Sequence, residues 1–482
     1  MSLNKTIETL WNGHRTVRVA LMGTQNSGKT VFLTAIANHL RNHSPDNFNL
    51  GGIRVGCRGV PASPGRGDFP RFDATTARQA FARGEWPAKT TEPSLLALSL
   101  TLADTGTGKR EDVLLEILDI PGERIADFPM MGRNYREWCS WLQTAWNGPD
   151  DAIDTYRRYL DRVQGVDPGG RDAVRSALFA AYRDFLAESY ANHAAHVSPS
   201  TVKLEWDGTP HGGPSKEAFL DAIRDVPLGI RAADGRVREF VPLPCDAFDR
   251  KSPWRPLAGE FSKAYDIYAK KVVRPLERWL HGATTLVYLV DVLTLLKSGP
   301  QAWFAEKSYG EAAIRMLCPR RGGNLIKRWG TRLWGLLVQT EIRRVRIVAG
   351  KADLVLAGDR DNLGKLAEDL FGNVLDASDA RASVCAAVSS TEQVTVDQEG
   401  TPVPALRGKV DSAFVPAGSG DTQIWFPSPV PPSPPATACL WQSRIDEGAF
   451  NYPSTFPVFN PYVGIPPEHL GLNSLVRDIL AR

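Results

Sequence analysis

The sequence of 482 residues predicts an α/β fold, in which a mixed and mostly parallel sheet is interrupted by a large, mainly helical insertion. Three observations predict it. A short apolar, β-branched run at residues 17–23 stops at a glycine-rich loop, and such a run is typical of a buried central strand. Two further apolar runs, joined by a glycine-rich turn, occupy residues 94–120. Strand-like runs return after residue 283, behind a long region of helical, charged sequence.

Length and composition limit the class of protein. At 482 residues the chain is too long for one compact domain, and its 43% hydrophobic and 23% charged residues are ordinary for a globular protein. Its 57 basic and 54 acidic residues nearly balance, at a net charge of +3, so nucleic acid is not expected as an obligatory partner. The six cysteines are scattered without a close pair, which is typical of reduced thiols in the cytoplasm.

The N-terminal elements follow in order. After the strand Val17–Gly23 and its loop, apolar residues recur at helical spacing, so a helix is expected from Lys29. Residues 44–93 are rich in Gly, Pro and Arg, with one helix predicted over Ala74–Arg83. The next two apolar runs flank Thr105–Glu111, a turn so short that only an antiparallel hairpin fits.

The middle of the chain is helical, and strands return behind it. The predicted helices are Tyr135–Trp146, Ala152–Val163, Arg171–His196 and Phe261–Trp279, and the predicted strands lie in Thr284–Leu293, Arg344–Gly350 and Ser383–Ser390. The apolar run 284–296 is too short to span a bilayer and contains Asp291, so no transmembrane segment is expected. The proline-rich stretch Phe426–Pro435 cannot be regular helix or sheet, and the helix Leu472–Ala481 closes the chain.

The loop GTQNSGKT, Gly23–Thr30, matches the pattern G-x-x-x-x-G-K-[S/T] in full. Its glycines let backbone N–H groups point at phosphate oxygens, and the following helix places its positive dipole end there. Lys29 then reaches the β- and γ-phosphates, and the Thr30 hydroxyl binds Mg²⁺. A chance match is the alternative, which the flanking strand and helix disfavour. The predicted nucleotide-binding residues of this segment are Gly23, Gln25, Asn26, Ser27, Gly28, Lys29, Thr30 and Val31.

A second motif, VLLEILDIPGE, ends an apolar strand in Asp119. An Asp at that strand end holds Mg²⁺, usually through a water. The D-x-x-G spacing then lets the Gly122 backbone N–H face the γ-phosphate. The alternative is an ordinary strand-to-turn junction, because D-x-P-G is also common turn chemistry.

A third motif, Gly350-Lys351-Ala352-Asp353, follows a predicted strand. In GTPases the corresponding [N/T]-K-x-D sets the Asp carboxylate on the guanine N1–H and N2–H₂ and the Lys stem along the base. Gly350 lacks the side-chain strut of the usual Asn or Thr. The alternative is a helix start with Asp353 near its first turn. Asp291 either faces the same cleft at the carboxyl edge of the sheet or caps the next helix.

Two weaker signals complete the predicted site. After the strand Ser383–Ser390, a backbone N–H near Ser389 or Ser390 could read guanine O6, although many strand ends look alike. Thr90 or Thr91 could complete the Mg²⁺ shell from a loop that can move, the alternative being a plain linker.

With these motifs in order, the chain resembles the YcjX-like family of bacterial P-loop proteins, which is linked to stress response. The resemblance covers nearly the whole length and implies a P-loop NTPase fold with a Ras-like GTPase core, a helical insertion and binding of GTP or GDP. The family often has T-K-A-D where this chain has G-K-A-D. The matching stretches are GTQNSGKT, RGEWPAKT, DIPGERIADFPMM, FSKAYDIYAKKVVRP, YLVDVLTLLKSGP, AGKADLV and FPVFNPYVGIPPEHLGLNSL.

The antiparallel hairpin supports the same interpretation, because Ras-type GTPases place an antiparallel edge strand at that point. We therefore expect residues 1–125 and 284–482 to form the two parts of a nucleotide-binding core, and residues 126–283 to form the insertion.

Phosphoryl transfer needs positioning and charge compensation more than covalent chemistry, and Lys29 with Mg²⁺ supplies most of both. Glu123 stands where many GTPases carry a water-orienting Gln, and Gln25 lies close to the γ-phosphate position. These departures predict slow intrinsic hydrolysis. Arg83 and Arg124 are candidates for an internal arginine finger, although most arginines are solvated surface residues.

The leading hypothesis is a GTPase-like switch that reports its nucleotide to a protein partner through the helical insertion. An ATPase and a non-enzymatic scaffold that binds GDP structurally are the alternatives. The basic stretch Arg320–Gly335 could touch an anionic membrane surface or a nucleic acid, or it could be a solvated helix.

Overall fold

The chain forms two compact units in a computed structural model. The first comprises residues 1–121, 283–297 and 342–482, and the second comprises 122–282 and 298–341. The sequence placed the divisions at 125/126 and 283/284 and assigned no part of 298–341 to the second unit. The residues that the structure describes are 15–24, 26–59, 69–144, 150–166, 170–193, 197–204, 215–232, 234–318, 341–375, 379–410 and 422–481.

The first unit is built on a seven-stranded sheet with the strand order β2-β3-β4-β1-β7-β8-β9. The strands β4, β1, β7, β8 and β9 run parallel to one another, whereas β3 is antiparallel to both of its neighbours. The sheet is therefore mixed and mostly parallel, as predicted. Its strands are β1 (Arg15–Gly23), β2 (Ile53–Gly59), β3 (Ser94–Asp104), β4 (Arg110–Asp119), β7 (Thr285–Val290), β8 (Arg344–Ala349) and β9 (Asp379–Val384).

The predicted antiparallel hairpin is confirmed. β3 and β4 pair from Ser94 opposite Asp119 to Ala103 opposite Arg110. Its outer strand is not the edge of the sheet, however, because β2 pairs with β3 on the far side. No strand was predicted over Ile53–Gly59, where Val55 alone is fully buried.

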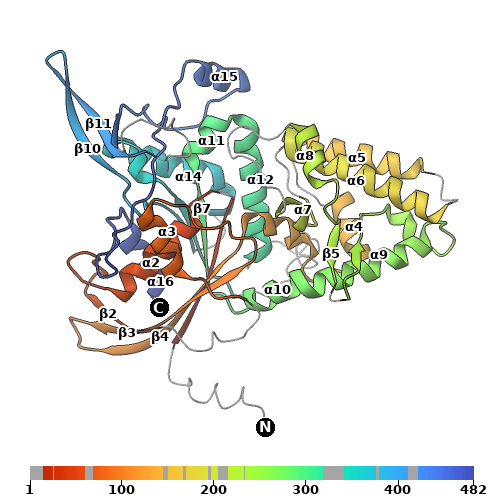
Figure 1. The fold of residues 1–482 in the computed structure, drawn as a ribbon, viewed down its shortest axis with the longest axis horizontal. Coiled ribbons are helices and arrows are strands. Elements are labelled where there is room, and N and C mark those ends of the chain that lie inside the picture. The colour runs from red at the N-terminus through yellow and green to blue at the C-terminus, as the bar shows by residue number, and fades with distance from the viewer. Residues whose placement is uncertain are drawn as a thin grey trace, which may run out of the picture. The chain divides into compact units, whose positions relative to one another are not determined.

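The C-terminal third differs from the prediction at two places. The predicted strand Ser383–Ser390 lies too late, because β9 ends at Val384, where it pairs with Ala349 of β8. A three-stranded sheet was also missed, and Figure 1 shows its first two strands projecting as a long hairpin. Its strands are β10 (Thr391–Gln398), β11 (Thr401–Lys409) and β12 (Thr422–Trp425).

Helices cover the large sheet. α2 (Lys29–Arg41) packs on β1, β2 and β3, and α14 (Arg360–Leu375) packs on β8 and β9. The predicted helices from Lys29 and over Ala74–Arg83 are confirmed, the second as α3. Phe426–Pro435 is irregular, as its prolines require. The remaining helices of this unit are α11 (Val292–Ser298), α15 (Ala438–Asp446) and α16 (Leu472–Leu480).

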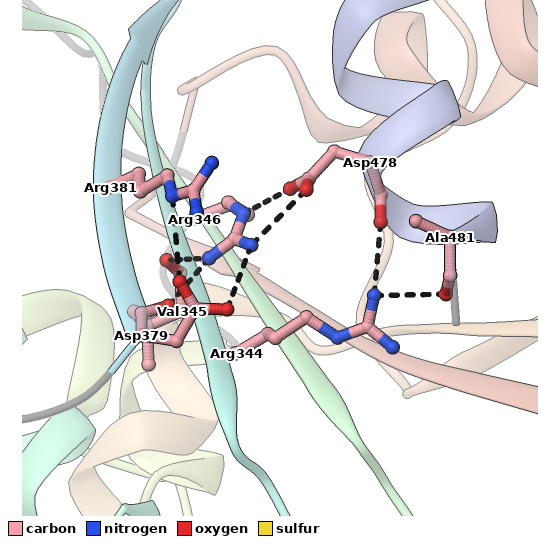
Figure 2. Close-up of polar contacts among 7 residues, drawn as sticks. All are labelled: Arg344, Val345, Arg346, Asp379, Arg381, Asp478 and Ala481. Atoms are coloured by element: carbon pink, nitrogen blue, oxygen red, sulfur yellow. Dashed lines mark hydrogen bonds and ion pairs between the residues drawn. The ribbon is translucent and has the colours of Figure 1, made fainter.

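The C-terminal helix α16 is tied to the sheet through a buried arginine (Figure 2). The Arg346 guanidinium binds both Asp478 on α16, through its Nε and Nη2, and Asp379 on β9. Arg344 donates to the Asp478 and Ala481 carbonyl oxygens at 3.1 and 3.0 Å. Burial alone would raise the pKa of Asp478, but the hydrogen bond and charge of Arg346 hold it below its usual value. These contacts attach the end of the chain to β8 and β9.

The second unit is mainly helical. The predicted helix over Phe261–Trp279 begins earlier and contains a π-helical turn, η3 (Ala269–Val273). None of the helices in the described ranges is long and apolar enough to cross a bilayer. The elements of this unit are η1 (Gly122–Met130), α4 (Tyr135–Thr144), α5 (Asp150–Gln164), α6 (Arg171–His193), α7 (Thr201–Leu204), α8 (Lys216–Ile223), β5 (Gly229–Arg231), β6 (Val237–Glu239), η2 (Cys245–Phe248), α9 (Arg255–Tyr268), α10 (Arg274–Leu280) and α12 (Pro300–Leu317).

Candidate functional site

The glycine-rich loop joins β1 to α2 at the carboxyl edge of the sheet. Lys29, the first residue of α2, folds back over the loop, and its Nζ donates to the Gly23 and Thr24 carbonyl oxygens at 2.8 and 2.9 Å. The loop closes on itself through the Ser27 N–H, which donates to the Thr24 carbonyl at 3.3 Å. A lysine ammonium is therefore held over the amino end of a helix, where anions are favoured.

Backbone geometry explains why glycine occupies positions 23 and 28 of the motif. Gly28 (φ 92°) and Asn26 (φ 63°) adopt left-handed conformations that few side chains tolerate. A β-carbon at Gly23 would lie 2.3 Å from the Leu289 carbonyl oxygen, so no other residue fits there. Ser27 is buried, whereas Thr30 and Val31 are half-buried; Gln25 lies outside the described residues.

Asp119 ends β4 beside this loop. It pairs with Leu21 of β1 in the parallel ladder, and the next residue, Ile120, donates its N–H to the Leu21 carbonyl at 3.0 Å. The Asp119 side chain is only 1% exposed. The carboxyl ends of β4 and β1 thus place Asp119 and the glycine-rich loop at the same edge of the sheet.

The other residues predicted on the phosphate side of the site are Thr90, Gly122 and Glu123, with the arginine-finger candidates Arg83 and Arg124. Thr90 is half-buried in an irregular stretch, and among the described residues it makes no hydrogen bond to the loop. Gly122 and Glu123 begin η1 in the second unit, where Glu123 is buried together with Arg124. Arg83, the other arginine-finger candidate, is exposed and pairs with Glu85 at 2.9 Å.

At the end of β8, Lys351 forms an ion pair with Asp291 at the end of β7. The Lys351 Nζ lies 2.5 Å from Asp291 Oδ2. Asp291 also accepts from the Thr294 N–H and hydroxyl, so it caps α11, one of the two roles the sequence left open. Burial alone would raise the pKa of Asp291, but Lys351 and the Thr294 hydrogen bonds together hold it below its usual value.

Asp353 lies in the short 3₁₀ helix η4 (Ala352–Leu354) and is 4% exposed. Its Oδ2 accepts from the Ser390 N–H at 2.8 Å and from the Ser390 hydroxyl at 2.5 Å. Burial raises the pKa of Asp353, and the Ser390 hydrogen bonds oppose that rise. The structure thus brings Ser390 to Asp353. The Ser389 N–H instead donates to the Glu468 carbonyl at 2.7 Å.

A cluster of histidines lies where the segment after Glu468, the partner of Ser389, meets the carboxyl-terminal end of α2. His469 follows Glu468, and its ring meets the ring of His39 on α2 edge-on at 5.0 Å. His39 also stacks on Phe48 at 4.4 Å. Burial first, and then the neighbouring His469 and His43, lower the pKa of His39 to about 3.

This low pKa predicts a loss of stability in acid. Between pH 6.5 and about 3 the unfolded chain binds a proton at His39 that the folded chain does not, so stability falls as the pH falls. We expect His39→Phe to flatten this part of the pH profile, measured as thermal midpoints from pH 7.5 to 4.5. The exposed His281, changed to Gln, is the matched control. A profile as steep as that of the wild type would contradict the prediction.

Comparisons with known proteins agree over nearly the whole chain. The model of the YcjX-like family, DUF463, matches residues 17–214 and 233–481. The Ras-like GTPase YcjX of Escherichia coli K12 is 27% identical over 494 residues, which cover 97% of this chain and 95% of that protein. A Ras-like GTPase YcjX of Shewanella oneidensis is 31% identical over 158 residues, which cover 27% of this chain and 32% of that protein.

Proposed function

The chain belongs to the YcjX-like family, and from this premise we propose that it is a P-loop protein that binds guanine nucleotide and hydrolyses GTP slowly. Both YcjX relatives carry the name Ras-like GTPase. One observation carries the proposal: among the consecutive parallel strands β4, β1, β7 and β8, β4 ends in Asp119, β1 ends in the glycine-rich loop and β8 is followed by Lys351–Asp353. In open α/β sheets, ligands bind at the carboxyl ends of the strands.

The donor set at this edge fits Mg²⁺. The candidate ligands are the Thr30 hydroxyl, at the start of α2, and the Asp119 carboxylate on the adjacent strand. Oxygen donors from one or two side chains suit Mg²⁺, which keeps several waters and binds substrate phosphates. Among the described residues, no group of three or more His, Cys, Asp or Glu side chains could hold a metal ion. When bound, Mg²⁺ would neutralise charge between the β- and γ-phosphates.

The chain's own residues supply the remaining functions. The backbone N–H groups of Gly23–Thr30 and the Lys29 ammonium bind phosphate oxygens, for which the ammonium exchanges its present carbonyl partners. Asp353 accepts from the guanine N1–H and N2–H₂, with Ser390 fixing its carboxylate. Gly122, Glu123 and Gln25 are the proposed γ-phosphate neighbours. Glu123 is a poor water-positioning group beside a polyanion, so hydrolysis is slow.

Contacts of η1 support a switch role. Asp127 on η1 accepts from the Ser200 N–H at 3.0 Å, the Ser200 hydroxyl at 2.5 Å and the Tyr268 hydroxyl at 2.7 Å. The Ser198 hydroxyl donates to the Ala126 carbonyl at 2.6 Å. The segment that follows the D-x-x-G motif is thus part of the interior of the second unit. We propose that nucleotide-dependent movement of Gly122 changes this packing and is sensed by a protein partner. A stress-related role rests on the family resemblance alone.

Equilibrium binding tests the proposal. Fluorescent GDP, GTP, ADP and ATP, each with Mg²⁺, are titrated into the wild type and into Lys29→Ala. We expect guanine preference in the wild type and a loss of affinity of about tenfold to a hundredfold in the variant, because the removed ammonium makes charge-assisted hydrogen bonds to phosphate. The exposed lysine change Lys365→Ala, on α14, is the control. Adenine preference would favour an ATPase instead.

Two further measurements separate the switch from its alternatives. Single-turnover hydrolysis as fast as that of an efficient enzyme would contradict the slow rate. Equal affinity for GDP and GTP, without any hydrolysis, would favour a scaffold that binds GDP structurally. The basic stretch Arg320–Gly335, with its proposed membrane contact, lies outside the described residues.

A further inference from the structure

Asp291 links the carboxyl ends of β7 and β8, the two strands that follow β1 in the sheet order. It comes directly after β7 and is 6% exposed. Its carboxylate serves two elements at once, because Thr294 donates to it from the first turn of α11 and Lys351 donates to it from the end of β8. Of these contacts, only the ion pair with Lys351 concerns the proposed base site.

Lys351 has an unusual backbone. Its φ of 60° lies in the left-handed region, which strains any residue with a β-carbon. Such a conformation persists where surrounding contacts hold it. Here the Lys351 side chain is held by Asp291, and the next residue, Ala352, donates its N–H to the Cys385 carbonyl at 3.3 Å. This conformation sets the direction in which η4, and with it Asp353, leaves the strand.

Gly350, just before Lys351, holds this segment only through its backbone, because its N–H donates to the Val290 carbonyl at 2.9 Å and it has no side chain. A β-carbon there would lie 3.6 Å from the Ser27 carbonyl oxygen, which is ordinary contact distance. A polar side chain at position 350 would therefore reach the glycine-rich loop without a clash. Glycine makes no such contact, so the base site and the phosphate loop lack a direct side-chain link at this point.

We propose that Asp291 is a positioning residue for the base site, which holds Lys351 and so aims Asp353 in place of a side-chain strut from position 350. The inference rests on the proposed binding of guanine nucleotide. It assigns to Asp291 a role beyond capping α11. Because the ion pair joins β7 to β8, loss of the carboxylate would misplace the guanine-reading group and leave the phosphate contacts of Lys29 untouched.

The two roles of Asp291 can be separated by substitution. Serine is as good an N-cap as aspartate, so Asp291→Ser keeps the start of α11 and removes the partner of Lys351. Thr294→Val removes the hydroxyl that donates to Asp291 and keeps the ion pair, so it is the matched control. Thermal unfolding of both variants fixes a temperature at which each is folded.

Affinities for GDP and ADP, each with Mg²⁺, are then measured at that temperature. We expect Asp291→Ser to weaken GDP roughly tenfold and to leave ADP unchanged, because a charge-assisted contact behind the guanine-specific group is lost. Thr294→Val should keep the wild-type ratio of the two affinities. A purely structural role would weaken both nucleotides alike, and an unchanged ratio in Asp291→Ser would overturn the inference.

A second variant tests the replacement of the strut directly. Adding Gly350→Asn to Asp291→Ser should restore most of the lost GDP affinity, because the new amide can contact the Ser27 carbonyl. A double variant that binds GDP no better than Asp291→Ser would overturn the claim that the ion pair takes the place of a strut. A wild type without guanine preference would refute the proposed function itself, and that result is visible before any variant is compared.

Discussion

Replacing Asp353 by Asn should shift the preference of this chain from guanine towards xanthine nucleotide by about three orders of magnitude. A carboxylate accepts both the N1–H and the N2–H₂ of guanine, whereas the asparagine amide presents one acceptor and one donor. Xanthine carries an oxygen in place of the guanine amino group, so it accepts from that donor. The amide oxygen can still accept from the Ser390 N–H, which now lies 2.8 Å from Asp353 Oδ2. The main loss of guanine affinity therefore comes from the base contact, where the amide N–H₂ of Asn would face the N2–H₂ of guanine.

The measurement is the ratio of the dissociation constants for GDP and XDP in the wild type, in Asp353→Asn and in the control Asp361→Asn. Asp361 is exposed in the first turn of α14, so its change should leave the ratio unaltered. An Asp353→Asn protein that keeps its guanine preference would show that Asp353 does not read the base. Its buried carboxylate would then be a structural partner of Ser390 alone.

The contact of Ser390 with Asp353 illustrates which part of the site could not be predicted. The glycine-rich loop, Asp119 and Lys351–Asp353 each lie within one short stretch of chain, so local patterns identify them. The contact between Asp353 and Ser390 joins residues 37 positions apart. It depends on where β9 ends, and the sequence placed that end six residues too late. The partner of Lys351 likewise comes from another strand, 60 positions away.

The missed strands have weak local signals. β2 alternates Ile53, Val55 and Cys57 with exposed residues, but only Val55 is fully buried and two of the seven residues are glycines, which disfavour a strand. Pairing with β3 and packing of α2 stabilise it. β11 contains Pro402 and Pro404, which disfavour a central strand. Its Ala405 and Leu406 are buried, but their neighbours are mostly exposed. Both strands are stabilised by tertiary partners rather than by local preference.

The parallel strands β1, β7 and β8 were predicted because their apolar residues are the ones that the fold buries, and the same holds for the predicted helices. All six residues of β7 are buried, which gives the continuous apolar run of a central parallel strand. β9 sits at the edge of the same sheet and is half-exposed, so its residues are small or polar. The same sheet therefore contains strands that were predicted correctly and one, β9, whose bounds were wrong.

Replacing Asp127 by Ala should lower the free energy of unfolding of the second unit by about 3–5 kcal/mol. The change removes one acceptor from three buried groups: the Ser200 N–H, the Ser200 hydroxyl and the Tyr268 hydroxyl. It also leaves the Arg124 guanidinium, whose Nη1 lies 3.8 Å from Asp127 Oδ2, without that opposite charge in a buried site. Hydrogen exchange resolved along the chain measures the loss for each unit separately. Asp161→Ala, at an exposed position of α5, should change it by no more than about 0.5 kcal/mol.

The charge of Asp127 can be separated from its hydrogen bonds with Asp127→Asn. Burial raises the pKa of Asp127, against the opposing effects of Arg124, Ser200 and Tyr268. A folded pKa above the unfolded value means that the folded unit binds more protons, so this contribution to stability is lost as the pH rises through the folded pKa. Asparagine does not titrate, and the stability difference between the wild type and Asp127→Asn should therefore shrink from pH 4 upwards. A difference that grows with pH would show that the ion pair with Arg124 outweighs burial, and that the carboxylate is held charged inside the unit.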